Sequence, residues 1–381
     1  MCMIMSLRLN NMRRFILSLV GLSALLVSCG KSADAVLQGQ PIYLSVSLPY
    51  TTTTKVPFEG EAPTTANPLN ADVWASTTPN EYVDKRWDGS SAYDHKVSIH
   101  TSGHFQSGDP QLLSQAIYPP PRTTNNGTTT ADPVYFVSMY PIGWTNTAET
   151  PTLANYTFSG TEDIMFAPQV SGAYDLKDQN QVVNDSPVLR FEHLLTRITV
   201  KVGVVMEEGE RIEDLKSAWG PITDLKIQSY NKSGDYVESS NKVTVDLSKG
   251  DAFNYDNDVT FERVQGESMG FFKLGTDDSF PGSGGYELTE RPDSVAYVMC
   301  APVVATADAH EYVITVETQN RGVQTLEMDI QKTASSDEGT GTTRANHFLV
   351  TLNFKKGRAV ATMVNIPDWE NGGYGTGDIE D

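Results

Sequence analysis

Cysteine is nearly absent from this sequence, with three residues among 381. Cys2, Cys29 and Cys300 cannot form a disulfide framework, because two of them lie within the first 30 residues. Positive charge is also scarce, since 28 Lys and Arg stand against 48 Asp and Glu, for a formal net charge of -20. A chain this acidic repels phosphate backbones and anionic headgroups, which argues against nucleic-acid binding and against electrostatic docking on membranes.

The apolar run near the N-terminus is too short for a membrane-spanning helix. Phe15 to Val27 has 13 residues, whereas a span needs roughly 20. Three arginines precede it, so residues 1–28 are predicted to be a signal peptide. The run ends in Leu26-Val27-Ser28-Cys29, which resembles the lipobox of bacterial lipoproteins, and Cys29 is therefore the expected lipidation site. Its acyl chains would hold the protein on a membrane. An ordinary secreted protein with an incidental Cys29 is the alternative.

Composition and length predict a loop-rich all-β protein of two domains. Hydrophobic residues make up 39% of the chain, aromatic residues 9%, and there are 30 Gly and 20 Pro. At roughly 150 residues per domain, the length suffices for two domains with cores of their own. No cofactor is expected, because the Gly-rich segment 281–285 lacks the strand-to-helix setting of a phosphate-binding loop.

Apolar and polar residues alternate in many segments, and this period of two is typical of strands that bury one face of a sheet. In the first segment, Ile42, Leu44, Val46 and Leu48 share one face. The same pattern recurs at 198–204, 243–247, 312–316, 348–354 and 360–366. Short strands with turn residues between them predict antiparallel β-sandwiches.

Composition also marks loops and a domain boundary. The threonine run at 51–54, Lys55 and the Pro- and Thr-rich stretch to Leu69 predict an exposed segment. A long loop is predicted at 119–133, and short helices at 110–117 and 207–217. The polar stretch 176–187 precedes the strongest strand, so the boundary is placed near Asp185, with domains at 29–185 and 186–381.

Four short motifs occur in a characteristic order along the chain. Residues 187–200 (PVLRFEHLLTRITV) resemble the Phe-x-His-x-Leu strand entry of the fimbrillin-like (Mfa-like or FimA-type) pilus lipoprotein family of Bacteroidales. Residues 134–141 (VYFVSMYP) resemble its central strand, and residues 163–167 (DIMFA) resemble the segment that follows. Residues 347–354, with Ile366-Pro367-Asp368-Trp369, are similar to its closing strands. Together with the lipobox, the resemblance covers nearly the whole chain after the signal peptide.

This resemblance implies two transthyretin-like antiparallel β-sandwich domains and a structural subunit of a fimbria that mediates adhesion. It also implies that the lipidated precursor reaches the outer membrane, where a trypsin-like protease cuts beyond the first strand. A strand from another pilus subunit then fills the vacated groove. Uncut relatives serve as anchors at the base of the fibre.

The residues themselves favour the same mechanism. Four apolar side chains on one face of 42–48 are followed by threonines and the isolated base Lys55. Burying each such side chain contributes about 1.5 to 3 kcal/mol, or roughly 6 to 12 in all, whereas a whole domain is stable by about 5 to 15. Loss of this strand should leave a sandwich that is barely folded unless another strand replaces it. An edge strand followed by a solvated loop lysine is the plainer alternative.

Two details of the mechanism stay open. Many family members have Arg at the cleavage site, and Lys85-Arg86 offers a second basic pair, so processing is expected after Lys55 or after Arg86. The donated strand is expected within Ala359–Trp369, unless those residues complete their own domain.

No metal site or catalytic residue is expected. His100 and His104 fall on one strand face but His95 falls on the other, and no cysteine or nearby carboxylate completes the set, so solvated histidines are expected. A packed, hydrogen-bonded side chain is expected for His193, and a buried one for Cys300. The acidic loops at 256–258 and 277–278 lack the Gly and bidentate Glu of a calcium loop.

A surface lipoprotein that binds glycan through an aromatic patch is the competing function. An enzyme is disfavoured, because neither paired carboxylates nor a nucleophile-base spacing occurs. Five tryptophans could form the patch, although this number is ordinary for two cores: Trp74, Trp87, Trp144, Trp219 and Trp369.

Overall fold

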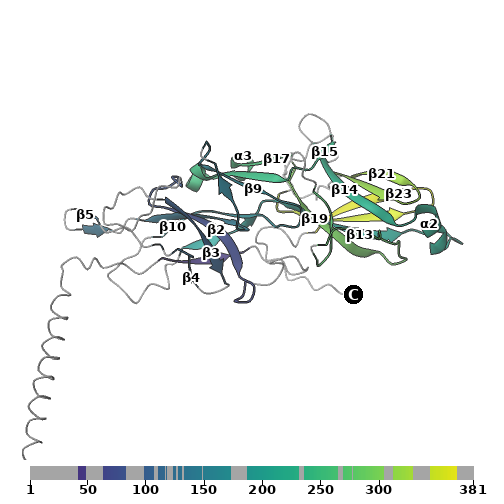
Figure 1. Cartoon of the computed structure of the whole chain (residues 1–381), viewed down its shortest axis with the longest axis horizontal. Coiled ribbons are helices and arrows are strands. Elements are labelled where there is room, and N and C mark those ends of the chain that lie inside the picture. Colours follow the sequence, from purple (N-terminus) through teal and green to yellow (C-terminus); the bar gives the residue numbers. More distant parts are fainter. Residues whose placement is uncertain are drawn as a thin grey trace, which may run out of the picture. The chain divides into compact units, whose positions relative to one another are not determined.

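The computed structural model describes residues 42–48, 63–82, 98–106, 110–115, 117, 123–125, 128–130, 133–147, 149–172, 187–230, 236–264, 269–276, 278–303, 312–328 and 344–366. Within these ranges the protein is all-β, as predicted: most elements are strands and the helices are short (Figure 1). Residues 41–381 form one compact unit.

A five-stranded antiparallel sheet lies at the centre of the N-terminal part of the fold. Its order is β12-β10-β7-β2-β3. These strands span Glu192–His193, Met165–Gly172, Val134–Tyr140, Leu69–Ser76 and Ser98–Phe105. The motif at 134–141 was predicted to be a central strand, and β7 is indeed the middle strand of this sheet.

Two smaller sheets cover the two faces of this central sheet. The first has the order β11-β1-β4 and joins Val188–Arg190, Tyr43–Ser47 and Gln111–Leu112. The second has the order β17-β16-β9-β8 and joins Val259–Glu262, Lys242–Asp246, Leu153–Thr157 and Thr145–Asn146. A separate hairpin pairs β5 (Thr123–Asn125) with β6 (Thr128–Thr130).

Side-chain alternation in the central sheet creates two cores. On β7, Val134 and Phe136 pack with Ile42 and Leu44 in a cluster that we call the β1 core. Val137 and Met139 point to the opposite face and pack with β9 and β16 in a second cluster, the β16 core. Since successive side chains of a strand point to opposite faces, β7 buries both of its faces between the two smaller sheets.

The C-terminal part is a sandwich of two further sheets. Their orders are β18-β19-β13-β22-β23 and β15-β14-β20-β21. The core between them holds the alternating apolar residues predicted at 198–204, 312–316 and 348–354. The strands of the first sheet span Phe272–Lys273, Asp293–Cys300, Thr196–Val204, His347–Phe354 and Ala359–Ile366, and those of the second span Tyr236–Glu238, Ile222–Tyr230, Tyr312–Thr318 and Gly322–Met328.

The helices are α2 (Ile212–Trp219), α3 (Tyr255–Asp258) and the 3₁₀ segment η1 (Leu247–Ala252). α2 begins five residues later than the predicted start at Glu207 and ends at Gly220, whose φ of 67° is in the left-handed region that glycine adopts without strain. The Trp219 indole N–H donates to the Lys355 carbonyl at 2.8 Å, which fixes the helix on the sandwich.

Two predictions about local structure were wrong. The predicted helix at 110–117 is instead the two-residue strand β4, followed by a bridge from Leu113 to Gly103. The predicted loop at 119–133 contains the β5–β6 hairpin. An isolated eight-residue helix is marginal in water, whereas β1 and β3 offer backbone partners to residues 111–113.

Strand pairing crosses the predicted boundary near Asp185. β11 and β12 follow that residue in the chain, yet they pair with β1 and β10. β16 also follows it and pairs with β9. The N-terminal layers therefore recruit two later segments of the chain, because the chain returns to complete sheets begun before residue 185.

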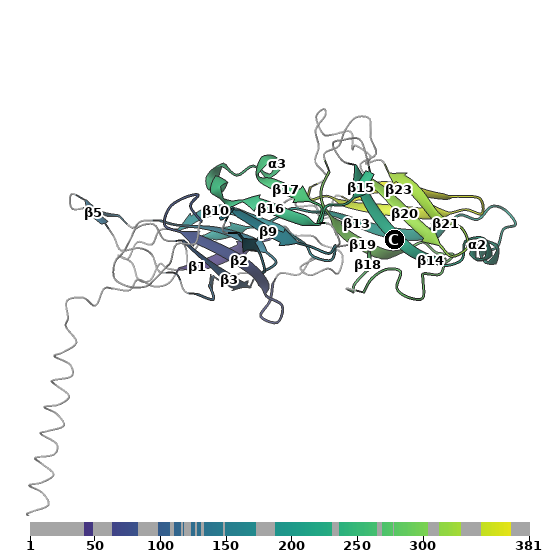
Figure 2. The ribbon, with the colours of Figure 1, turned by 45° about the horizontal axis from the view of Figure 1, so that its top comes forward.

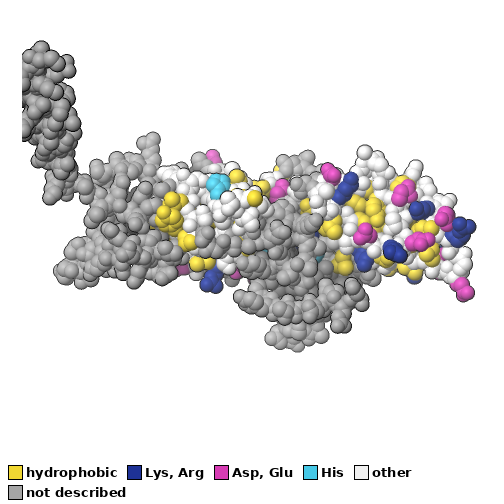
Figure 3. Space-filling view, turned by 90° about the horizontal axis from the view of Figure 1, so that it is seen from below, with side chains coloured by type: hydrophobic (Ala, Val, Ile, Leu, Met, Phe, Trp, Pro, Cys, Tyr) yellow, Lys and Arg dark blue, Asp and Glu magenta, His cyan; other side chains and the backbone are white. Residues whose placement is uncertain are grey.

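Within the ranges described, no helix is both long and apolar enough to cross a membrane. On the face shown in Figure 3, acidic and basic side chains of the C-terminal sandwich are interspersed with apolar ones and do not gather into a patch of one sign.

A buried histidine in the C-terminal sandwich predicts acid sensitivity. His347 Nε2 lies 2.8 Å from Thr199 Oγ1, and burial, then the charge of Arg197, lowers the pKa of His347 to about 3 from its usual 6.5. Below pH 6.5 the unfolded chain therefore binds a proton that the folded chain does not, so stability falls as the pH drops from 6.5 toward 3. By pH 4.5 this contribution is about 2 to 3 kcal/mol.

We expect His347→Gln to remove this part of the acid destabilisation. Urea unfolding of the variant should show a loss between pH 7 and pH 4.5 that is smaller than in the wild type by about 2 to 3 kcal/mol. The control is His104→Gln, because His104 lies on the exposed side of β3. Parallel pH curves for wild type and His347→Gln would contradict the prediction.

Candidate functional site

The first strand of the described chain occupies the middle of a three-stranded sheet. β1 pairs in parallel with β11, with Ser45 opposite Val188 and Ser47 opposite Arg190. On its other side it pairs antiparallel with β4, with Tyr43 opposite Leu112. The plainer alternative, in which this segment is an edge strand, is therefore wrong, because β1 has a neighbour on each side. Its parallel partner, β11, follows residue 185 in the chain, and the sequence of β1 itself contains no signal that predicts this pairing.

Few backbone hydrogen bonds flank β1, because both neighbouring strands are short. β11 has three residues and β4 has two. Near the ends of β1, the Ile42 N–H donates to the Ile117 carbonyl at 2.7 Å, and the Phe191 N–H donates to the Ser47 carbonyl at 2.9 Å. The Ser45 N–H donates to the Pro187 carbonyl at 3.0 Å. β1 is thus tied to the sheet over a short length.

The side chains of β1 hold it more firmly than its backbone does. Ile42 and Leu44 are fully buried in the β1 core, and Val46 and Leu48 pack against that core half-buried. The predicted sharing of one face by these four residues is confirmed. Figure 2 shows β1 at the side of the central sheet where β2 and β3 lie. The surface that β1 covers is built by apolar residues of those strands and of β7 and β10: Leu69, Ala71, Val73, Phe105, Phe136, Met165 and Ala167.

The residues predicted for lipidation and cleavage lie outside the described ranges. Cys29, Lys55, Lys85 and Arg86 belong to this group, as do the signal peptide 1–28 and His95. The predicted donor segment is described up to Ile366, and there it forms β23, which pairs with β22 along eight residues. In this structure those residues complete their own sheet, which is the second of the two interpretations made from the sequence.

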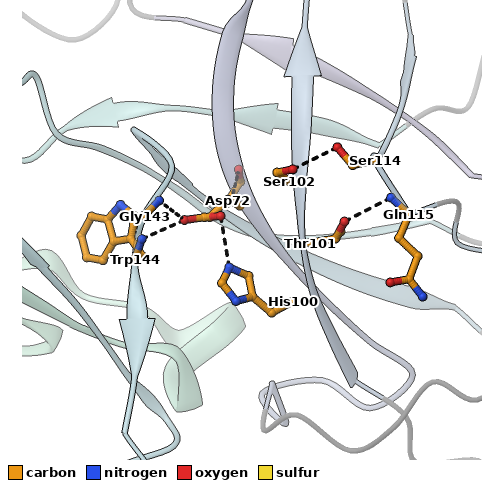
Figure 4. A network of polar contacts seen from close by, with 9 residues as sticks. Asp72, His100, Thr101, Ser102, Ser114, Gln115, Gly143 and Trp144 are labelled. Carbon is orange, nitrogen blue, oxygen red and sulfur yellow. Dashed lines mark hydrogen bonds and ion pairs between the residues drawn. The ribbon is translucent and has the colours of Figure 1, made fainter.

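A polar cluster lies on the face of the central sheet opposite the β1 core, and it was not predicted from the sequence. Asp72 of β2 is buried, and its Oδ2 accepts hydrogen bonds from the Gly143 and Trp144 backbone N–H groups at 2.6 and 2.8 Å (Figure 4). Its Oδ1 lies 3.2 Å from His100 Nε2. The His100 ring stacks on Trp74, with centroids 4.2 Å apart.

The prediction of a solvated His100 without a nearby carboxylate was therefore wrong, because Asp72 lies beside its ring. Only the pairing of β2 with β3 brings Asp72 next to it, at the diagonal position from the Trp74–His100 pair. His104 lies on the same face, as predicted, and its Nδ1 is hydrogen-bonded to Asn70 Oδ1. Among the residues described, no three His, Cys, Asp or Glu side chains gather as a metal site would need.

Two further predictions are confirmed. His193 is buried, and its Nδ1 lies 2.9 Å from Asp163, so the pair links the segments 187–200 and 163–167. Cys300 is fully buried, and burial raises the pKa of its thiol to about 12, as suits an inert apolar side chain.

An aromatic patch of tryptophans does not form from those that the structure describes. Trp74, Trp144 and Trp219 are each at most 2% exposed. Trp87 and Trp369 lie outside the described ranges. The three described rings therefore serve the cores.

Comparison with known proteins finds similarity only among solved structures. No protein-family model matches the chain, and no curated protein matches it. A candidate cell adhesion protein from Bacteroides ovatus has 13% identity and a TM-score of 0.44, over 90% of this chain and 99% of that one. Another, from Bacteroides uniformis, has 14% identity and a TM-score of 0.41, over 87% and 98%.

A fimbrial protein from Bacteroides vulgatus has 13% identity and a TM-score of 0.37, and the match covers 86% of this chain and 98% of that one. Two of these three structures are described as cell adhesion proteins and one as a fimbrial protein.

Proposed function

We propose that this protein is a structural subunit of a cell-surface pilus that assembles by strand exchange after its first strand is removed. One observation carries the proposal: β1 supplies two fully buried side chains to the β1 core but is flanked by strands of only three and two residues. A strand held mainly by its side chains can be exchanged for another strand with the same apolar pattern.

The free energy of burial favours replacement of β1 once it has been removed. Burial of Ile42 and Leu44 contributes about 3 to 6 kcal/mol, and the half-buried Val46 and Leu48 add to it. The total is comparable with the roughly 5 to 15 kcal/mol by which a domain is stable. A chain that has lost β1 would therefore expose the β1 core until another strand covers it.

The vacated slot would have polar edges that select an extended peptide. The Ile117 and Pro187 carbonyls and the Phe191 N–H would all lose their partners. An incoming strand that reproduces the direction of β1 runs parallel to β11 and antiparallel to β4. Its backbone would restore these hydrogen bonds, and apolar residues at every second position would refill the core.

Processing would couple this exchange to export. In this proposal Cys29 is lipidated, the precursor reaches the cell surface on the outer membrane, and a trypsin-like protease cuts after Lys55. The cut releases both the lipid anchor and β1, because both lie on its N-terminal side. If the chain stays uncut, it would serve instead as the anchor at the base of the fibre.

Limited trypsin digestion tests the proposal. We expect the purified Cys29→Ser chain, secreted without lipid, to be cut after Lys55 and then to form a ladder of oligomers that resists boiling in detergent. N-terminal sequencing should show that the oligomers begin at Val56. Lys55→Gln should remain monomeric, whereas the matched control Arg86→Gln should polymerise normally.

Three outcomes would contradict the proposal. The first is a cut chain that remains monomeric at high concentration, because exchange would then not follow cleavage. The second is a ladder whose members all retain residues 42–48. The third is an uncut chain found once per fibre, at its base, which would assign the anchor role.

A further inference from the structure

The outer face of the β17-β16-β9-β8 sheet forms a hollow of about 870 Å³ that plays no part in strand exchange. The inward side chains of this sheet, such as Ala154, Val243 and Val245, are fully buried in the β16 core. The alternate residues point outward and line the hollow. We call this surface the outer-sheet groove; β9, β16 and β17 lie side by side beneath it (Figures 1 and 2).

Strand register arranges the polar side chains of the groove in rows. Thr145 pairs with Asn155, Asn155 with Thr244, and Thr244 with Thr260, so four strands each place one hydroxyl or amide group at the same level. Neighbouring strands lie about 4.8 Å apart. In the middle of the row the buried Thr244 hydroxyl donates to Asn155 Oδ1 at 2.7 Å, and Asn155 Nδ2 donates to the Leu153 carbonyl at 3.2 Å. The exposed hydroxyls of Thr145 and Thr260, on the two outer strands of the row, are groups that can donate and accept hydrogen bonds.

The charges in the groove cancel. In the second row, Thr157 pairs with Lys242 and Lys242 with Glu262, and Lys242 Nζ lies 3.0 Å from Glu262 Oε2. Lys242 and Glu262 are the two charged residues that line the hollow within the described ranges. A groove with one paired acid and base offers no net charge to attract an ionic ligand.

Apolar side chains also line the groove. Ile142, in the turn before β8, is 46% exposed, and Leu153 lines the hollow on the far side of Asn155. Tyr156 pairs with the inward Val243 and packs against the β16 core, and part of its side chain also lines the hollow. Burial raises the pKa of the Tyr156 phenol above its usual value, so its hydroxyl stays protonated at neutral pH. The buried Asp72 holds the turn beside Ile142 by accepting from the Gly143 and Trp144 N–H groups, which keeps this end of the groove in place.

We propose that the outer-sheet groove binds a neutral oligosaccharide. A sugar ring carries hydroxyls that donate and accept, which match the threonine and asparagine rows, and C–H faces that match Ile142 and Tyr156. The volume lies within the roughly 300 to 1,000 Å³ of ligand sites. Polyanions are disfavoured by the net charge of -20, and a purely apolar ligand would cover the exposed Thr145 and Thr260 hydroxyls without offering them a hydrogen-bond partner.

Native gel electrophoresis tests this inference on the full uncut chain, so the result does not depend on cleavage or polymerisation. Four gels each contain one neutral polysaccharide: α-mannan, dextran, β-1,3-glucan or xylan. We expect the protein to migrate more slowly in at least one of them, and to migrate at its normal rate in a gel that contains the anionic polysaccharide alginate. Titration calorimetry with oligomers of the retarding polysaccharide then gives its Kd.

Two variants locate the site. Thr260→Arg should fill the groove, and the double variant Thr145→Val with Thr260→Val removes two hydroxyls at nearly constant volume. Each is expected to weaken binding by at least about tenfold. Thr325→Arg is the matched control, because Thr325 is an exposed residue on β21 of the other sandwich. It should bind like the wild type, and circular dichroism verifies that every variant is folded.

The inference is overturned if none of the four neutral polysaccharides retards the wild type, or if alginate alone does. It is equally overturned if the double valine variant binds with wild-type affinity, because the threonine row would then not contact the sugar. Success or failure here leaves the trypsin experiment unaffected, so the two proposals are judged separately.

Discussion

A disulfide that ties β1 to β4 is expected to abolish polymer growth even after the chain has been cut. In the register of the sheet, Tyr43 lies opposite Leu112, and the Leu112 side chain is 42% exposed. Directly opposed residues of antiparallel strands have Cα atoms about 4.5 to 5.5 Å apart, within the range that a disulfide spans. Tyr43→Cys with Leu112→Cys should therefore close, and the cut β1 segment would remain covalently attached in its slot.

The measurement is the boiling-resistant ladder after trypsin treatment, with and without reductant. Dithiothreitol should restore the ladder in the double cysteine variant, because reduction frees β1. The matched control is Thr315→Cys with Thr325→Cys, an opposed pair on β20 and β21 in the C-terminal sandwich, which should polymerise with its disulfide intact. Polymers formed at the wild-type rate by the oxidised Tyr43–Leu112 pair would show that β1 is not the strand that leaves.

Replacing Leu44 with aspartate is expected to destabilise the N-terminal layers by about 4 kcal/mol or more. The change removes roughly 1.5 to 3 kcal/mol of apolar burial and places a carboxyl group among the side chains of the β1 core, where Leu44 has no exposed surface. Effects of this size are exceptional for a single substitution. Urea unfolding followed by circular dichroism measures the loss.

Ser47→Asp is the control for the charge itself. Ser47 lies on the same strand but is exposed, and surface changes of this kind stay within about 0.5 kcal/mol. Equal destabilisation by the two aspartates would mean that burial at Leu44 is not what holds β1.

The same pair of substitutions tests the slot directly. A synthetic peptide of residues 41–48 should bind the chain from which β1 has been removed, and the peptide with Ser47→Asp should bind similarly. The peptide with Leu44→Asp should lose at least about a hundredfold in affinity, as about 3 kcal/mol implies. Equal binding of the two aspartate peptides would show that the slot does not read the apolar face.

Periodicity in the sequence was enough to predict the individual strands. Five strands lie where the alternation of apolar and polar residues predicted them: β13, β16, β20, β22 and β23. The alternation predicts these strands because each of them buries one face. The burial of Ile42 and Leu44 followed from the same pattern. The predictions for short elements were wrong. β4 and the β5–β6 hairpin are too short to show a period of two, and the partner of β4 is the distant strand β1.

By itself, the sequence determined the all-β class, the apolar face of the first strand and the buried state of His193 and Cys300. These properties depend on side-chain alternation and on residue type, which are local. Only the tertiary structure decided that β1 lies between β11 and β4, that Asp72 meets His100, and that three threonines and an asparagine from four strands form one row. Each of these depends on which strands lie next to one another in a sheet and in which register, and the side-chain pattern within one strand does not specify its neighbours.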